Sequence, residues 1–422
     1  MRDIVFSENF MWGVSTSSHQ IEGNNKNSDW YEWENEKGRI KDNTYSDPGC
    51  DSEHNFDRDL RMIKDINMNT YRFSIEWAKI QPNEDTFDEE YIEMYDSFIK
   101  NLLENNIKPI VTLFHFSLPK WFSKKGGFQE SSNLDYFYKY IEKMIKKFGN
   151  KVKYYTIINE PVVYAYQSYV EGIWPPGKRN EDEAMKILKN LLYVYDTSYQ
   201  IIKKINPDTK VSIAKHTAVY KPYRSSNIFD QIAYKKVMKY FDHSFIDSIL
   251  EGQIKKPIGK NEKYSFNSDF DFLGINYYTK RYIKYSKNKI IIENRNDMLS
   301  DIGWPVYPEG IEEVLKRFKR YKKPIIITEN GIADSQDRYR TMYILRTLYE
   351  IANSIKEGID VKGYMHWSLM DNFEWSEGRS MRFGLYKTDY SNMNFYLRNS
   401  GKIYATIAQE NKIIESNMMF IK

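Results

Sequence analysis

The sequence lacks the features of a membrane protein or of a disulfide-stabilised secreted protein. Cys50 is its single cysteine, so no disulfide can form within the chain. No apolar run approaches the ~18 residues that cross a bilayer. The start of the chain has no extended apolar core of the kind found in a secretory signal. We therefore expect a cytoplasmic protein that does not bind a membrane.

Excess charge of one sign and clustered metal ligands are absent as well. The 62 Lys and Arg residues nearly balance the 58 Asp and Glu residues, and the formal net charge is +4. The two signs alternate along the chain, which is typical of a solvated surface and not of a nucleic-acid interface. Only 6 histidines occur, without a His-Glu-x-x-His motif or another metal-ligand spacing. We expect no nucleic-acid partner, no metal and no cofactor.

The sequence does contain enough apolar material for a large core. Hydrophobic residues make up 41% of the 422 residues, which allows one large α/β barrel or a few ordinary domains. Aromatic residues make up 16%, including 35 Tyr and 9 Trp. Such side chains fill cores, and they also offer flat apolar faces on which sugar rings stack.

Short apolar segments rich in β-branched and aromatic residues alternate with longer amphipathic helical patterns. The predicted strands are Phe10–Ser15, Thr70–Ile75, Pro109–His115, Tyr154–Asn159, Lys210–Lys215, Asp271–Tyr277, Pro324–Glu329 and Gly363–Ser368. The predicted helices include Glu53–Ile66, Glu89–Asn105, Leu134–Phe148, Glu181–Ile205, Tyr234–Leu250, Pro308–Tyr321 and Tyr339–Glu357. This alternation predicts an α/β fold, a (β/α)8 TIM barrel that takes up residues 1–422 as a single domain.

A doubly wound open sheet is the rival fold. It is disfavoured because no glycine-rich phosphate turn follows the first strand. Two polar segments, Asn261–Phe266 and Ser286–Asp301, are predicted to be surface excursions from the barrel.

The stretch Pro324–Gly331 is the most informative part of the chain. Three consecutive isoleucines predict a strand buried on both faces, and Glu329 follows near its carboxyl end. Core packing does not explain this carboxylate, because burying an unpaired charge is costly. In α/β barrels the carboxyl ends of the strands carry the chemistry. Glu329 is therefore either a structural ion-pair partner or a catalytic carboxylate, and we favour the second interpretation.

Other predicted strands also end in polar or aromatic residues. These residues are His115, Asn159, Glu160, Asn276 and Tyr278, together with Trp367 on the last strand and Glu374 and Trp375 just beyond it. Each of them alone is more often a satisfied structural group. If the barrel closes, however, they converge on one pocket.

Glu160 and Glu329 would lie across the barrel mouth, as glycoside hydrolysis requires of an acid and a carboxylate. Asn159 could bind a sugar 2-hydroxyl, an interaction that strengthens in the transition state. Arg72 could keep Glu329 ionised by lowering its pKa, and a Tyr278 hydroxyl could orient it. The alternative for Arg72 is a barrel-stabilising ion pair, which is compatible with the first role.

The chain resembles glycoside hydrolase family 1, the β-glucosidase/β-galactosidase family, nearly from end to end. The segments that carry the resemblance are Phe10–Gly23, Tyr71–Trp77, Thr112–Pro119, Thr156–Pro161, Gly172–Gly177, Gly274–Thr279, Ile327–Gly331 and Trp367–Trp375. Asn-Glu-Pro alone is a weak signal, since many barrel glycosidases contain it. All of these segments in order are highly specific.

The resemblance implies a role for each matching position. It implies Glu160 as the acid/base and Glu329 as the nucleophile of a double displacement with retention at the anomeric carbon. The positions matching groups that bind the sugar or surround the nucleophile are Gln20, His115, Asn159, Glu374, Trp375, Trp367, Arg72, Asn276 and Tyr278. The implied enzyme is an exo-acting β-glucosidase with β-galactosidase and β-fucosidase side activity. Its implied substrates are small-molecule β-glycosides or short β-linked oligosaccharides.

The chain departs from the family pattern in three places. Phe116 and Ser117 stand where many relatives have Trp-Asp, and His216 stands where Asn is commoner, without an assigned role. The segment Ile332–Asp337 leads directly into the next helix where relatives carry a longer loop. Because such loops form the barrel mouth, we predict a more open aglycone side.

Two other functions are possible on the same fold. A 6-phospho-β-glycosidase needs a cationic phosphate pocket, and Glu374 would repel a phosphate there. A non-catalytic sugar-binding relative would not need both glutamates, yet both are present. The sequence leaves open the preferred sugar, because Gln20, Glu374 and Trp375 can bind glucose or galactose. It also leaves open whether the chain forms a homo-oligomer.

Overall fold

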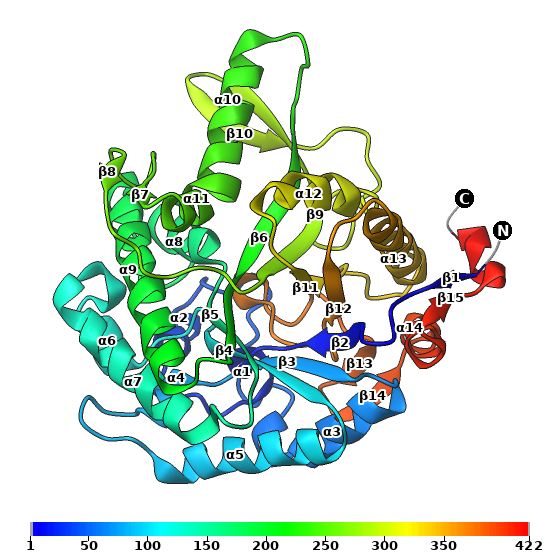
Figure 1. Cartoon of the computed structure of the whole chain (residues 1–422), viewed down its shortest axis with the longest axis horizontal. Coiled ribbons are helices and arrows are strands. Elements are labelled where there is room, and N and C mark those ends of the chain that lie inside the picture. The colour runs from blue at the N-terminus through cyan, green and yellow to red at the C-terminus, as the bar shows by residue number, and fades with distance from the viewer. Residues whose placement is uncertain (1–2, 421–422) are drawn as a thin grey trace.

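The predicted strands close into a ring of parallel strands (Figure 1). The computed structural model describes residues 3–420. In spatial order the ring consists of β2 (Met11–Ser15), β3 (Thr70–Ser74), β4 (Lys108–Phe114), β5 (Tyr154–Asn159), β6 (Lys210–Pro222), β9 (Leu273–Ser286), β11 (Ile325–Asn330) and β12 (Val361–Trp367). β6 pairs with β9, and β12 pairs with β2, so the ring is complete. The predicted (β/α)8 barrel is confirmed.

Helices surround the ring on its outside (Figure 1). The helices between and after the barrel strands include α3 (Phe56–Asp65), α5 (Glu89–Glu104), α7 (Leu134–Phe148), α9 (Glu181–Ile205), α10 (Ile228–Met238), α11 (Ser244–Leu250), α12 (Gly310–Phe318), α13 (Arg340–Lys356) and α14 (Asn399–Glu410). Short helices that follow strand ends or lie in connecting loops are α1 (Ser18–Ile21), α2 (Asp29–Glu34), α4 (Trp77–Ile80), α6 (Lys120–Lys124) and α8 (Pro161–Tyr169).

Helix α5 shows how the sequence specifies one of these elements. The Asp88 side chain accepts hydrogen bonds from the first backbone N–H groups and caps the helix start. Ile92, Tyr95, Ile99 and Leu102 recur at helical spacing and are completely buried. This apolar face holds the helix against the barrel, while its opposite face stays charged and exposed.

The two ends of the barrel differ in chemistry. Near the amino ends of the strands, Met11, Ile110, Phe272, Ile326 and Met365 form one buried apolar cluster. These side chains close the bottom of the barrel without leaving an unpaired polar group. The polar side chains of the predicted site lie toward the carboxyl ends of the strands.

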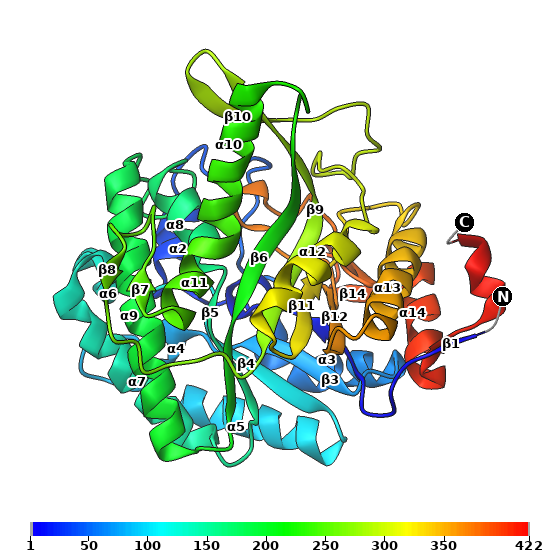
Figure 2. The ribbon, with the colours of Figure 1, turned by 45° about the horizontal axis from the view of Figure 1, so that its top comes forward.

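Strands β6 and β9 run well past their predicted ends at Lys215 and Tyr277. They stay paired with each other as far as Pro222 and Ile283, and β10 (Lys289–Glu293) adds an antiparallel strand to β9. Helix α10 packs beside this extension, which rises above the barrel (Figure 2). The segment Ser286–Asp301, predicted as a surface excursion, therefore contains a strand.

The helix predicted over Tyr234–Leu250 is longer and interrupted. Its first part, α10, begins at Ile228, where the Asn227 side chain caps it. A π-helical turn at Lys239–His243 separates α10 from α11. In the other predicted excursion, β8 (Glu262–Lys263) pairs with β7 (Gln253–Ile254).

Segments near the two ends of the chain meet beside the barrel. β1 (Ile4–Val5) pairs antiparallel with β15 (Lys412–Ile413). A further hairpin joins β13 (Tyr386–Asp389) to β14 (Asn394–Leu397) after the last barrel strand. Among the described residues, no helix has the length and apolar character needed to cross a membrane.

Candidate active site

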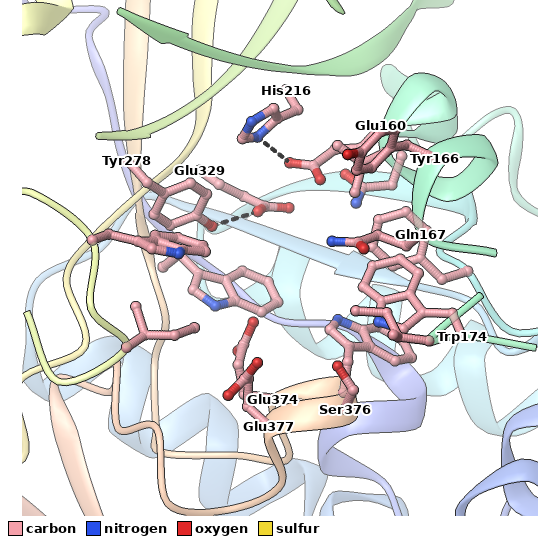
Figure 3. A pocket seen from close by; sticks show the side chains of 18 of the residues that line it. Glu160, Tyr166, Gln167, Trp174, His216, Tyr278, Glu329, Glu374, Ser376 and Glu377 are labelled. Carbon is pink, nitrogen blue, oxygen red and sulfur yellow. Dashed lines mark hydrogen bonds and ion pairs between the residues drawn. The ribbon is translucent and has the colours of Figure 1, made fainter. Parts of the chain in front are cut away.

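A cavity opens at the carboxyl end of the barrel, and most of the predicted site residues line it (Figure 3). The predicted residues in its wall are His115, Asn159, Glu160, Tyr278, Glu329, Trp367, Glu374 and Trp375. Gln20, Arg72 and Asn276 lie behind this wall, fully buried and bonded to residues that face the cavity. The barrel thus brings together side chains from strands that are far apart in sequence.

Glu329 at the end of β11 is held by two donors. The Arg72 guanidinium on β3 binds Oε1, and the Tyr278 hydroxyl on β9 donates to Oε2 at 2.6 Å. Arg72 is fully buried and Glu329 is 4% exposed. Because both carboxylate oxygens are bonded, the carboxyl group has a fixed orientation.

Glu160 immediately precedes helix α8 and has a left-handed backbone, φ 43° and ψ 59°. This conformation is unfavourable for a residue with a Cβ and is typical of functional sites. Its N–H donates to the Ala214 carbonyl at 2.7 Å, and Pro161 follows at the first helical position. The turn projects the Glu160 carboxyl into the cavity, where Asn276 Nδ2 donates to Oε1 at 2.8 Å.

The two carboxyl groups are connected through the barrel interior. From Glu329, Arg72 continues to Asn159 Oδ1 at 2.7 Å. Asn276 Nδ2 then donates to the same oxygen at 3.2 Å and to Glu160. The position of each carboxyl group is therefore tied to that of the other, as a reaction between them would require.

Burial has the largest effect on the protonation of Glu329. It raises the pKa of Glu329 to about 7, against the lowering by Arg72, and the Glu160 carboxylate raises this pKa further. The contact between Arg72 and Glu329 was predicted correctly. Arg72 lowers the pKa of Glu329, as predicted, but the cost of burying the carboxylate exceeds the combined stabilisation by Arg72 and the Tyr278 hydroxyl.

Glu374 and the aromatic residues form the opposite wall. Burial raises the pKa of Glu374 to about 8, and the nearby Glu329 carboxylate acts in the same direction. Gln20 Nε2 lies 3.4 Å from Glu374 Oε2 and also donates to the Phe373 carbonyl. Near neutral pH the Glu374 carboxyl is thus largely protonated, so it can donate as well as accept a hydrogen bond.

The His115 ring is nearly parallel to those of Trp367 and Trp375, with ring centroids 6.0 and 6.2 Å away. Burial and the Arg72 charge keep the pKa of His115 well below its ordinary value, so the ring is neutral. Its Nε2 faces the Asn159 amide nitrogen at 3.2 Å and accepts from it. The proton then lies on Nδ1, which is buried and has no hydrogen-bond partner among the described residues.

The positions that depart from the family pattern also have defined places. Phe116 lines the cavity and contacts Trp174, at 4.7 Å between ring centroids. The Ser117 hydroxyl turns away and donates to the Glu76 carboxylate at 2.8 Å. His216, which has no role assigned from the sequence, lies with Nδ1 3.6 Å from Glu160 Oε1 (Figure 3).

Sequence reasoning missed most of the outer wall of the cavity. These lining residues are Val163, Tyr166, Gln167, Ile173, Trp174, Tyr220, Phe241, Arg281, Ile292, Ile302, Trp304, Ser376, Glu377 and Phe383. Several of them lie on or beyond the extensions of β6 and β9, which the local sequence pattern did not predict. Within residues 3–420, no cluster of three or more His, Cys, Asp or Glu side chains is arranged to hold a metal ion.

Comparisons with known proteins agree with this geometry. The model of glycosyl hydrolase family 1 matches residues 2–413. The 1,4-beta-D-glucan glucohydrolase of Thermotoga neapolitana is 30% identical, over 97% of this chain and 99% of that protein. Beta-glucosidase A of Thermotoga maritima is also 30% identical, over 96% and 98%. A solved beta-glycosidase from Pyrococcus horikoshii superposes with a TM-score of 0.92 at 35% identity, covering 99% of this chain and 98% of that one.

Proposed function

Since the chain belongs to glycosyl hydrolase family 1, we propose that it is a retaining, exo-acting β-glucosidase with Glu160 as acid/base and Glu329 as nucleophile. The observation that carries this proposal is the pair of buried glutamates at the ends of β5 and β11. A continuous chain of hydrogen bonds through Arg72, Asn159 and Asn276 connects them. Two linked carboxyl groups in one cavity are the machinery of glycoside hydrolysis.

The reaction proceeds in two displacements. Glu329 attacks the anomeric carbon while Glu160 donates its proton to the departing glycosidic oxygen. Glu160, now a carboxylate, removes a proton from water as that water attacks the glycosyl-enzyme, and the product retains the β-configuration. Arg72 and Tyr278 hold the attacking carboxylate in position throughout.

The inner end of the cavity binds the non-reducing sugar. We assign hydroxyl contacts to His115, Asn159, Glu374 and Trp375, and we assign the Trp367 indole as the apolar floor. Gln20 acts behind Glu374 and holds it through their contact at 3.4 Å. These assignments support terminal β-D-glucosyl residues, with β-galactosyl and β-fucosyl residues as further substrates.

The biological setting is proposed from the same observations. We propose that residues 1–422 act as one domain in carbohydrate metabolism on small β-glycosides and short β-linked oligosaccharides. A cytoplasmic location accords with the buried, unpaired Cys50. Fractionation would test the location, and sedimentation would test whether the chain forms a homo-oligomer.

The test of the mechanism is the stereochemistry of the product. Proton NMR during hydrolysis of 4-nitrophenyl β-D-glucoside should show β-glucose as the first anomer formed. In Glu329→Gly, kcat should fall by roughly 10⁴-fold or more, and azide should restore turnover with α-glucosyl azide as product. In Glu160→Ala, azide should instead give β-glucosyl azide. An α-anomer formed first by the unmodified protein would refute the proposal.

Matched 4-nitrophenyl substrates distinguish the β-glucosidase from the two alternative functions. Faster hydrolysis of 4-nitrophenyl 6-phospho-β-D-glucoside than of the unphosphorylated glucoside would identify a phosphoglycosidase. Against this, Arg281 is the one Lys or Arg among the described residues that line the cavity, and Glu374 faces the sugar end. Sugar binding without turnover would identify a non-catalytic relative.

A further inference from the structure

Arg281 occupies an unusual place in the outer wall of the cavity. It lies on β9 three residues beyond Tyr278, so at ~3.3 Å per residue it stands about 10 Å farther out. In a regular strand, residues three apart face opposite sides. Here the pairing of β9 with β6 passes from Thr217↔Tyr277 to Val219↔Lys280, which leaves one extra residue on β9. This bulge turns Arg281 to the cavity side that Tyr278 also faces.

The Arg281 guanidinium has no anionic partner in the described part of the chain. It stacks over the Trp304 ring at 4.8 Å, and none of the described residues forms an ion pair or hydrogen bond with its side chain. Burial lowers the pKa of Arg281 to about 10, with only the Tyr220 phenol acting against it, so the group stays charged at neutral pH. A partly buried cation that borders a cavity and has no ion-pair partner can bind an anion there.

The surroundings define what kind of anion fits. The wall around Arg281 is aromatic and aliphatic, with Tyr220, Phe241, Ile292 and Trp304 lining the same cavity. Such surfaces accept a flat aromatic ring. The cavity carboxyl groups belong to Glu160, Glu329, Glu374 and Glu377, and they would repel a second anion that lacked a cation beside it.

We propose that Arg281 binds an anionic group on the aglycone, so that this enzyme selects aryl β-glucosides whose aromatic ring carries a carboxylate. The inference rests on the proposed β-glucosidase function and specifies its leaving-group class. The guanidinium pairs with the carboxylate at the cavity mouth while the aromatic ring lies along Trp304 and its neighbours. Arg281 is here a specificity residue of the aglycone side and takes no part in bond cleavage.

The test compares 4-carboxyphenyl β-D-glucoside with its methyl ester. The measured quantity is the ratio of kcat/KM for the acid to kcat/KM for the ester, which is then compared between variants. Differences in intrinsic leaving ability cancel in that comparison. Arg281→Ala should lower the ratio by about 10- to 100-fold, the range expected for losing a hydrogen bond to a charged group. Raising the salt concentration should also lower the ratio in the unmodified enzyme.

Three further variants distinguish the loss of the charge from a change in packing. Arg281→Lys keeps the charge and should retain part of the preference, whereas Arg281→Gln should lose it. Lys280→Ala is the matched control, because it removes one positive charge at the preceding position of β9, where the ammonium binds Asp297 at 2.6 Å. The ratio should stay unchanged in this control.

The outcomes distinguish the inference from the proposed function. An unchanged ratio in Arg281→Ala, with hydrolysis of neutral glucosides by the unmodified enzyme, overturns the inference and leaves the β-glucosidase intact. A selective loss of cellobiose hydrolysis in Arg281→Ala with an unchanged ratio overturns it in favour of a second-sugar contact. If the unmodified protein hydrolyses no β-glucoside, both proposals fall.

Discussion

The inner and outer ends of the cavity are built in different ways. At the inner end, Glu329, Arg72, Asn159 and Glu160 are buried and joined by hydrogen bonds. At the outer end, Trp304 and its neighbours form an apolar wall, on which the Arg281 guanidinium lies without an ion pair or hydrogen bond to any described residue.

This difference indicates which end of the cavity tolerates amino-acid substitution. Moving an inner residue breaks bonds to two or three others, because the network spans four strands of the ring. At the outer end, Arg281 stacks on Trp304 and forms no ion pair or hydrogen bond with a described residue. The barrel therefore fixes the chemistry, while the extension can change the leaving group that is accepted.

The largest effect is expected at the inner end, in Glu160→Gln. This change keeps a group that can bond to Asn276 but removes the proton donor. Hydrolysis of phenyl β-D-glucoside should fall by roughly 10²–10⁴-fold in kcat/KM, the usual contribution of a general acid. The 2,4-dinitrophenyl glucoside should lose much less, since its leaving group needs no proton. Equal losses on both substrates would contradict the acid role, and Glu130→Gln on the surface serves as the control.

A smaller inner effect is expected in Tyr278→Phe. Loss of the hydrogen bond to Glu329 should lower kcat/KM by roughly 10- to 100-fold. Activity requires ionised Glu329, so kcat/KM falls as pH drops below its pKa of about 7. The Tyr278 hydroxyl lowers that pKa, and its removal should move this acid limb to higher pH. A pH–rate profile measures the shift.

The control for this variant is Tyr343→Phe. The Tyr343 hydroxyl donates to the Tyr278 carbonyl at 2.8 Å and does not contact the carboxylate. Its removal should leave the acid limb in place. A limb that stays fixed in Tyr278→Phe, or moves to lower pH, would show that the hydroxyl does not stabilise the charged nucleophile.

Glu374→Gln tests, through protein stability, whether the Glu374 carboxyl group is protonated in the folded state. In the folded protein the pKa of Glu374 is about 8, above the ordinary value of 4.5. The stability contributed by the protonated carboxyl group is therefore fully present below pH 4.5 and is lost as the pH rises through 8. Between pH 6.5 and 8, the unmodified protein should lose about 1–2 kcal/mol more unfolding free energy than the variant. Urea unfolding at the two pH values measures this difference. Identical losses would mean that the carboxyl group is not protonated in the folded state.

The smallest effect is expected at the outer end, in Trp304→Ala. Loss of this aromatic face should raise KM for neutral phenyl β-D-glucoside by about 5- to 10-fold, as expected for one aromatic contact. Methyl β-D-glucoside and competitive inhibition by glucose should be unaffected. Trp121→Ala on α6, outside the cavity, is a size-matched control. An equal loss on the methyl glucoside would show that the two ends of the cavity are not separable.

The inner end of the site could be predicted from the sequence because each residue follows a recognisable buried strand. The Ile325–Ile327 run locates Glu329, and the strand ending in Asn159 locates Glu160. Strand order then brings these positions together whatever the loops do. The local sequence pattern does not predict the pKa of Glu329, because this pKa depends on burial by the whole barrel.

The outer end could not be predicted because it also depends on contacts between segments that are far apart in the sequence. Beyond Lys215 and Tyr277 the strands carry lysine and arginine at half-exposed positions, such as Lys221 and Lys280, a composition that does not favour strand. They remain strands because β6 and β9 pair with each other, a contact between segments far apart in sequence. The bulge that turns Arg281 inward follows from that pairing, so no local motif marks it.

The hydrogen-bonded network also has a consequence for how the protein folds. Its bonds join residues that are 257, 87 and 117 positions apart in the chain. Contacts of such long range form late, because each requires closing a large loop. No partial barrel can hold the two carboxyl groups in place. The return of enzymatic activity during refolding should therefore coincide with closure of the ring, after the helices have already formed.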